Sequence, residues 1–112
     1  MNRDHLEKQL AQLGVEVSEY GGECYFGESS CCSVSLSPFP TEDVKHAKLA
    51  IRTSSDDERR EVVNAFLNAT GVVRTPEIAD ALSGHERRFE TASNFVTVAI
   101  VDDEYIVTVD AR

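Results

Sequence analysis

The sequence contains no long hydrophobic run. Its longest stretch that is both free of charge and rich in apolar residues, 91–101, is far too short to cross a bilayer. The first five residues lack the apolar region of a secretory signal. We therefore expect a cytoplasmic protein that neither spans nor binds a membrane.

Cysteine is scarce. Cys24, Cys31 and Cys32 are an odd number at irregular spacing, which is not a disulfide framework. No C-x-x-C pair occurs, and the histidines are scattered, so the spacing of a zinc site is missing. We expect neither a disulfide nor a bound metal, in agreement with a reducing compartment.

Patterns that accompany catalysis or cofactor binding are also missing. The glycines are dispersed, and Gly21-Gly22 precedes a predicted strand rather than a helix, so there is no phosphate-binding loop. The carboxylates fall in turns, caps and exposed strand positions. Acid–base catalysis instead needs two carboxylates in a cleft whose different surroundings give them different pKa values. Cys31 is the one candidate nucleophile, and its acidic, serine-rich neighbours disfavour a thiolate. We expect a protein that is not an enzyme and holds no cofactor.

Acid is what the sequence has in excess. Twenty Asp and Glu stand against eleven Lys and Arg, for a net charge of −9. This balance disfavours direct binding to nucleic acid, whose affinity for proteins comes mainly from basic side chains, and disfavours anionic membrane surfaces. The 112 residues, 41% of them hydrophobic, predict a single globular domain over 1–112.

Helices are predicted over residues 2–13, 55–69 and 75–84, each with a capping residue at its start and a glycine just after its end or closing it. Asn2 or Asp4 caps the first helix. Ser55 and Glu58 form a capping box for the second, which should stop at Gly71.

Alternating hydrophobicity predicts strands over 15–18, 23–26 and 31–37, with Cys32 buried and Cys31 on the wetter face. Residues 95–101 and 105–109 form a hairpin around Asp102-Asp103. For residues 41–53 the pattern fits a short helix and a strand equally well, so both predictions stay open. The predicted fold is α+β, with an N-terminal helix, an antiparallel sheet of about five strands, two central helices packed on one face and a C-terminal β-hairpin.

The acids are unevenly distributed. No base occurs between Lys8 and Lys45 or between Arg88 and Arg112, and both stretches are predicted to be mainly strands. The acids should therefore form a negative surface on the solvent face of the sheet, opposite the helices. The same acids would also serve solubility and oppose edge-to-edge aggregation. The candidate partner-binding residues are Glu16, Glu19, Glu23, Glu28, Asp102, Asp103 and Glu104.

These features favour a non-enzymatic module that binds a basic surface of a partner protein, as an inhibitor or adaptor. Where that surface normally binds nucleic acid, the carboxylates would stand in for phosphates. In size and charge the chain is similar to small acidic anti-defence proteins of phages and mobile elements, including anti-CRISPR proteins. We expect a monomer or a homodimer.

Two alternatives remain open. Residues 59–84 resemble part of a winged-helix DNA-binding domain, with residues 85–93 as the recognition helix and the last hairpin as the wing. The acids of that helix offset its Arg87 and Arg88, and the wing tip would bring three carboxylates to the DNA. The size, acidity and helix-then-strands opening also resemble secretion-type chaperones, although their closing helix is missing.

Overall fold

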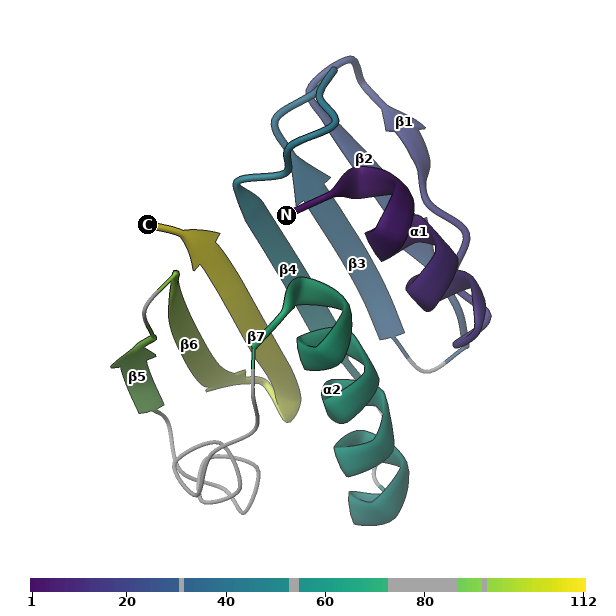
Figure 1. Cartoon of the computed structure of the whole chain (residues 1–112). Helices are drawn as coiled ribbons and strands as arrows, with labels where there is room; N and C mark the ends of the chain where they lie inside the picture. The colour runs from purple at the N-terminus through teal and green to yellow at the C-terminus, as the bar shows by residue number, and fades with distance from the viewer. Residues whose placement is uncertain (31, 53–54, 73–86, 92) are drawn as a thin grey trace.

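The structure, a computed structural model, describes residues 1–30, 32–52, 55–72, 87–91 and 93–112. Its seven strands form one antiparallel sheet in the order β1-β2-β3-β4-β7-β6-β5 (Figure 1). The elements are α1 (Arg3–Ala11), β1 (Ser18–Tyr20), β2 (Cys24–Glu28), β3 (Cys32–Ser37), β4 (His46–Ile51), α2 (Asp56–Thr70), β5 (Arg87–Glu90), β6 (Asn94–Val101) and β7 (Glu104–Ala111).

Both helices begin where local signals predict, and α2 also ends there, whereas α1 ends at Ala11, short of the predicted residue 13. The Asn2 side chain accepts a hydrogen bond from the His5 backbone N–H at 2.9 Å and caps α1. The Ser55 hydroxyl accepts one from the Glu58 N–H at 3.3 Å and caps α2. Gly71 ends α2 in the left-handed region at φ 82°. The two predicted caps and the predicted end of α2 are confirmed.

Strand β3 shows how the sheet acquires two different faces. Cys32, Val34 and Leu36 are buried, while the serines between them are only half-buried. The register places these three side chains opposite Ile51, Leu49 and Ala47 of β4. The predicted burial of Cys32 is confirmed, and Cys31 lies outside the described residues.

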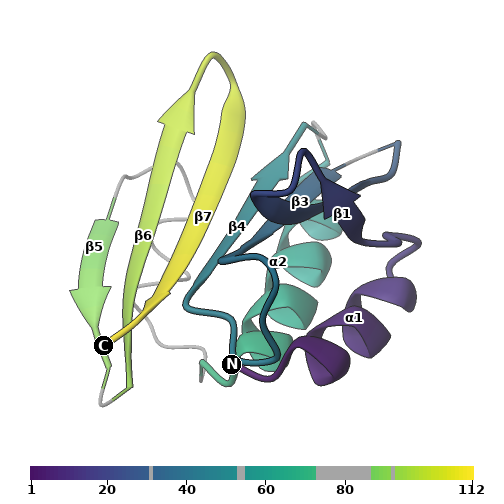
Figure 2. The same ribbon diagram turned by 90° about the horizontal axis from the view of Figure 1, so that it is seen from above.

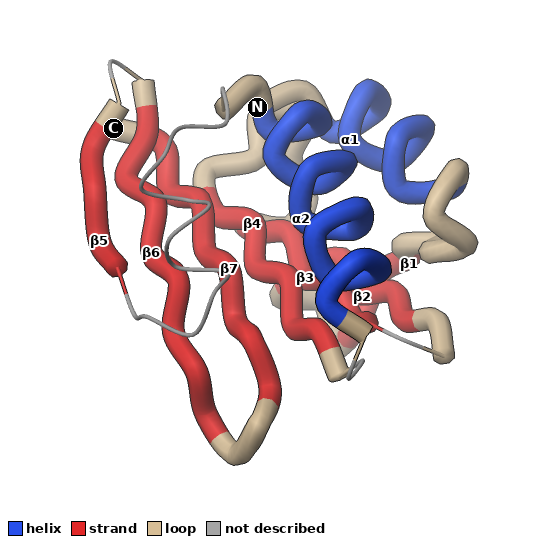
Figure 3. Tube along the Cα trace, turned by 90° about the horizontal axis from the view of Figure 1, so that it is seen from below, coloured by secondary structure: helices blue, strands red, loops and turns tan. Residues whose placement is uncertain are grey.

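The helices cover one face of the sheet. Figures 2 and 3 show α1 and α2 on the same side, over the part of the sheet formed by β1–β4. Leu6 and Leu10 of α1 and Phe66 of α2 are fully buried there. No helix in the described part of the chain is long and apolar enough to span a membrane.

Neither described helix lies on the other side of the sheet, which we call the open face. An antiparallel sheet tolerates this arrangement because alternate side chains can be polar. By register and burial, the open face consists of Ser18, Tyr20, Cys24, Phe26, Glu28, Ser33, Ser35, Ser37, His46, Lys48, Ala50, Glu104, Ile106, Thr108, Asp110, Phe95, Thr97, Ala99, Val101, Arg88 and Glu90.

The predicted fold class is wrong in its balance of sheet and helix. The sheet has seven strands instead of about five, and α2 is the one central helix within the described residues. The helix predicted over 75–84 lies outside them.

Residues 46–51, which local pattern left open, form β4 because β3 and β7 pair with it on both sides. Residues 87–90 form edge strand β5, so the recognition helix of the winged-helix alternative is wrong at those positions.

Gly27 of β2 lies against the chain that leads into β1. A Cβ atom at Gly27 would sit 2.3 Å from the Glu16 carbonyl oxygen, and the obstacle is backbone, which cannot rotate away. We expect Gly27→Ala to lower the free energy of unfolding by about 1–3 kcal/mol, the usual cost of overpacking. Urea denaturation measures this, with Ser33→Ala on the neighbouring strand as control. Equal stability of the Gly27→Ala protein would contradict the close approach.

The β6–β7 turn requires two residues with positive φ. Asp102 and Asp103 lie at φ 50° and 65°, which Asp tolerates and β-branched residues do not. We expect Asp103→Val to lower the free energy of unfolding by about 1–2 kcal/mol relative to Asp103→Gly. Thermal unfolding of the two variants side by side measures the difference. If the valine variant matched the glycine variant, the turn would have another conformation.

Candidate functional site

The seven predicted partner-binding acids lie on two hairpins and their flanks. Glu19 and Glu23 belong to β1 and to the β1–β2 turn at one edge of the sheet, whereas Asp102 and Asp103 form the β6–β7 turn. Strands β3 and β4 separate β2 from β7. At about 4.8 Å per strand, β2 and β7 are roughly 14 Å apart. The acids therefore form two groups, not one cluster.

Antiparallel order brings part of both groups to the same end of the sheet. Strand β2 ends there at Glu28, β7 starts there at Glu104, and the β6–β7 turn lies beyond them. Figure 1 shows that α2 also begins at this end. Its first turn adds Asp56 and Asp57, both exposed. The sequence pattern did not identify these two acids as part of this surface, because only the tertiary arrangement brings the start of α2 to the same end of the sheet as the start of β7.

The open face is not the continuous negative surface that the sequence predicts. Of the seven acids, only Glu28 and Glu104 occupy open-face positions. Glu19 pairs with the buried Tyr25 and so belongs to the helix side of its strand. The open face also carries bases. Lys48 lies in its middle, and Arg88 lies on β5. Negative charge instead collects in the turns, at the β1 edge and at one end of the sheet.

Ion pairing divides the acids into two sets. At the end opposite Glu28, Asp43 pairs with Lys45 at 2.6 Å, Glu90 with Arg112 at 3.5 Å, and Asp110 with His46. Of the seven predicted acids, Glu104 is the one with an ion pair to a described residue, Arg52, at 3.8 Å. Within the described part of the chain, no ion pair is found for the remaining six: Glu16, Glu19, Glu23, Glu28, Asp102 and Asp103.

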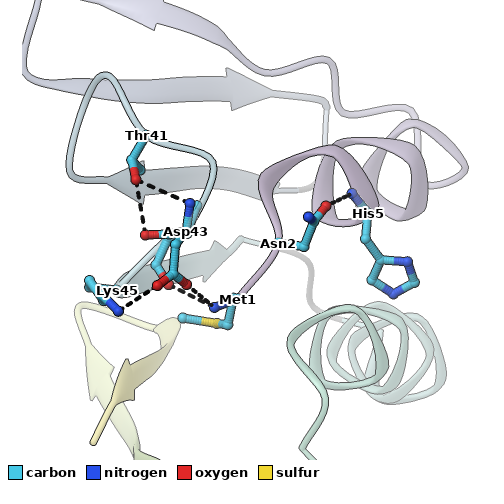
Figure 4. Close-up of polar contacts among 7 residues, drawn as sticks. Met1, Asn2, His5, Thr41, Asp43 and Lys45 are labelled. Carbon is cyan, nitrogen blue, oxygen red and sulfur yellow. Dashed lines mark hydrogen bonds and ion pairs between the residues drawn. The ribbon is translucent and has the colours of Figure 1, made fainter.

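Asp43 is the most strongly held of the paired acids (Figure 4). Its carboxylate accepts hydrogen bonds from Lys45 Nζ at 2.6 Å and from the amino group of Met1 at 2.9 Å. Its backbone N–H donates to the Thr41 hydroxyl at 3.1 Å. The Lys45 hydrogen bond first, and then the amino group, hold the pKa of Asp43 at about 2, below its ordinary value of 3.8. This carboxylate is therefore occupied by contacts within the chain.

One row of the open face brings Ser37, His46 and Asp110 to opposite positions on three adjacent strands. The His46 Nδ1 contacts the Asp110 carboxylate, as in an acyl-transfer triad. Between these described residues, however, no hydrogen bond joins the Ser37 hydroxyl to His46. Pro38 follows Ser37 and has no N–H to offer an oxyanion. The row therefore lacks two parts of such a site.

No group of three His, Cys, Asp or Glu side chains among the described residues could hold a metal ion. Comparisons of this chain with protein-family models, with curated proteins and with solved structures give no match. The features of this chain that bear on function are therefore those of its surface.

The lowered pKa of Asp43 links stability to pH. Because the carboxylate is more acidic in the folded state than in the unfolded chain, its contribution is complete above about pH 4 and is lost as pH falls towards 2. We expect Asp43→Asn to unfold at a lower temperature than the unaltered protein at neutral pH, and the difference to shrink between pH 4 and pH 2. Thermal melts across this range measure it, with Asp57→Asn as control. A difference that did not change with pH would contradict the assignment.

Proposed function

We propose that the chain is a non-enzymatic protein-binding module that presents the acids of its two hairpins to a basic surface of a partner protein, as an inhibitor or adaptor. The observation that supports this proposal is the absence of ion pairs at six of the seven hairpin and edge acids within the described residues. Elsewhere among the described residues, Asp43 and Glu90 are paired, whereas Glu42 and Glu61 form no ion pair and lie outside the hairpins.

Unpaired, exposed carboxylates suit recognition for a physical reason. Their field is not neutralised by a neighbouring cation, so it extends into solvent and steers a basic partner towards the surface. Exposed acids also lose no internal contact when a partner's Lys or Arg approaches. A paired acid such as Asp43 would first have to give up its hydrogen bond to Lys45.

The spacing of the two acidic groups suits a protein rather than a small ligand. With β2 and β7 roughly 14 Å apart, a standard interface of about 800 Å² per partner can span from Glu28 to the β6–β7 turn. A basic surface that normally binds nucleic acid is the partner class that fits, because carboxylates can take the place of phosphates there. In this proposal the module acts in the cytoplasm, as an anti-defence protein of the phage type would.

The described residues do not favour direct binding to DNA. The winged-helix alternative needs a recognition helix where β5 lies, and it needs a wing whose tip is compatible with phosphates. The tip of the β6–β7 hairpin instead carries Asp102 and Asp103, without a basic partner among the described residues.

Neutralising the β6–β7 turn tests the proposal. Asp102→Asn with Asp103→Asn removes two charges, and Asn tolerates positive φ, so the turn conformation is kept. We expect this double variant to capture the basic partner from host lysate about tenfold more weakly, since close interfacial charges contribute about 1.4 kcal/mol or more. Quantitative mass spectrometry of the eluted proteins measures the loss.

The control removes the same charge elsewhere. Glu42 and Glu61 are exposed and lie outside both hairpins, so Glu42→Gln with Glu61→Gln matches the change in net charge. Capture by this control should be retained. An equal loss with both double variants would mean that net charge alone retains the partner. Unchanged capture by the turn variant would remove the β6–β7 turn from the interface.

A further inference from the structure

The open face carries exposed apolar side chains. Among the described residues, the exposed large hydrophobic side chains are Tyr20 at 64%, Val101 at 50% and Phe95 at 38%. All three occupy open-face positions, on β1 and β6. Phe26 extends this surface, with its ring 5.4 Å from that of Tyr20. We propose that the open face is the interface of a homodimer, in which a second copy of the chain packs its own open face against it.

Charge favours a second copy over a strongly basic or acidic partner on this face. The face has four acids: Glu28, Glu90, Glu104 and Asp110. Four bases balance their charge. Lys48 and Arg88 lie on the face itself, and Arg52 and Arg112 form ion pairs with Glu104 and Glu90. The open face with these arginines is therefore neutral, and the remaining surface carries the whole net charge of −9. Two copies that met through the remaining surface would bring together two surfaces of the same net sign.

Three charges on the face remain available for contacts between copies. Within the described residues, none of Lys48, Glu28 and Arg88 forms an ion pair. A two-fold axis uses every contact twice, so one Lys48–Glu28 pairing would occur in two symmetric copies. The charges that are already paired, such as Arg112 with Glu90, would enter the interface with their partners, which avoids the larger cost of burying an unpaired charge.

The shape of the face is also suited to a second copy. Short side chains at Ser33, Ser35 and Ala50 leave a hollow of about 190 Å³, and a second hollow of about 360 Å³ lies beside Phe95 and Thr97. Tyr20 and Val101 project from the same face. Protruding and hollow regions on one surface are what an isologous interface requires, since each copy must supply both.

The face is large enough for a stable dimer. Seven strands at about 4.8 Å span roughly 30 Å, and the longer strands run for about 20 Å. That projected area, on the order of 600 Å² before the relief of the side chains is added, approaches the 800 Å² or so per partner of a standard interface. Two such sheets pack face to face about 10 Å apart, with their strands at about 30°.

Analytical ultracentrifugation of the full chain tests this inference. We expect the unaltered protein to sediment with the mass of two chains at micromolar concentration. Tyr20→Lys with Val101→Lys should weaken dimerisation by about 100-fold, because the two-fold axis places four lysines in the interface. Both positions are at least half exposed, so the monomer should still fold, which circular dichroism checks.

The matched control introduces the same charge on the helix side. Gln12 and Asn68 are exposed there, and Gln12→Lys with Asn68→Lys should leave the dimer intact. Sedimentation of the unaltered protein as a single chain up to about 1 mM, where any association would be weaker than about −4 kcal/mol, would overturn the inference. A Tyr20→Lys, Val101→Lys protein that dimerised like the control would overturn it as well.

Salt separates this inference from the proposed function. Two chains of −9 each repel, so raising the ionic strength should strengthen the dimer or leave it unchanged. Capture of a basic partner by the acidic hairpins should weaken under the same change. The homodimer does not rest on the proposed function, and each can fail without the other.

Discussion

Strand β4 is the element on which the rest of the structure depends. It is the middle strand of seven, paired with β3 on one side and with β7 on the other. The N-terminal half of the chain reaches the C-terminal half of the sheet through this strand. Its inward side chains Ala47, Leu49 and Ile51 join the two halves into one hydrophobic core beneath the helices. The register of β4 also decides which charges from distant parts of the sequence become neighbours.

That register explains why the acids have two different roles. The β4–β7 pairing brings His46 to Asp110 and Arg52 to Glu104. In the segment before β4, Asp43 pairs with Lys45. These carboxylates are therefore engaged in contacts within the chain. The hairpin turns extend past the last pairing partners, where no described cation lies close enough to pair with Asp102 or Asp103. Their charge therefore acts on the solvent, and it is the basis of the proposed function.

The chain therefore has two surfaces that differ in the interaction by which they would bind a partner. The turns and the sheet end are charged and polar, and long-range attraction governs any contact they make. The open face is neutral, has aromatic side chains at both sides and short side chains between them, and its contacts depend on burial and fit. Salt weakens the first kind of contact and leaves the second largely unaffected, so experiment can distinguish the two surfaces although Glu28 and Glu104 belong to both.

The sequence by itself determined the features that depend on residues close together in the chain. Asn2 and Ser55 cap their helices by accepting a hydrogen bond from the N–H three residues downstream, Gly71 ends α2, and Asp102-Asp103 forms the hairpin turn. Each of these signals acts within one turn of backbone. Only the tertiary structure decided that residues 46–51 and 87–90 are strands, since partners far away in the sequence supply their hydrogen bonds. The same is true of the candidate site. Sequence predicts which segments are acidic, but pairing between distant strands decides that Lys48 and Arg88 share the open face with Glu28, and so that the face is neutral.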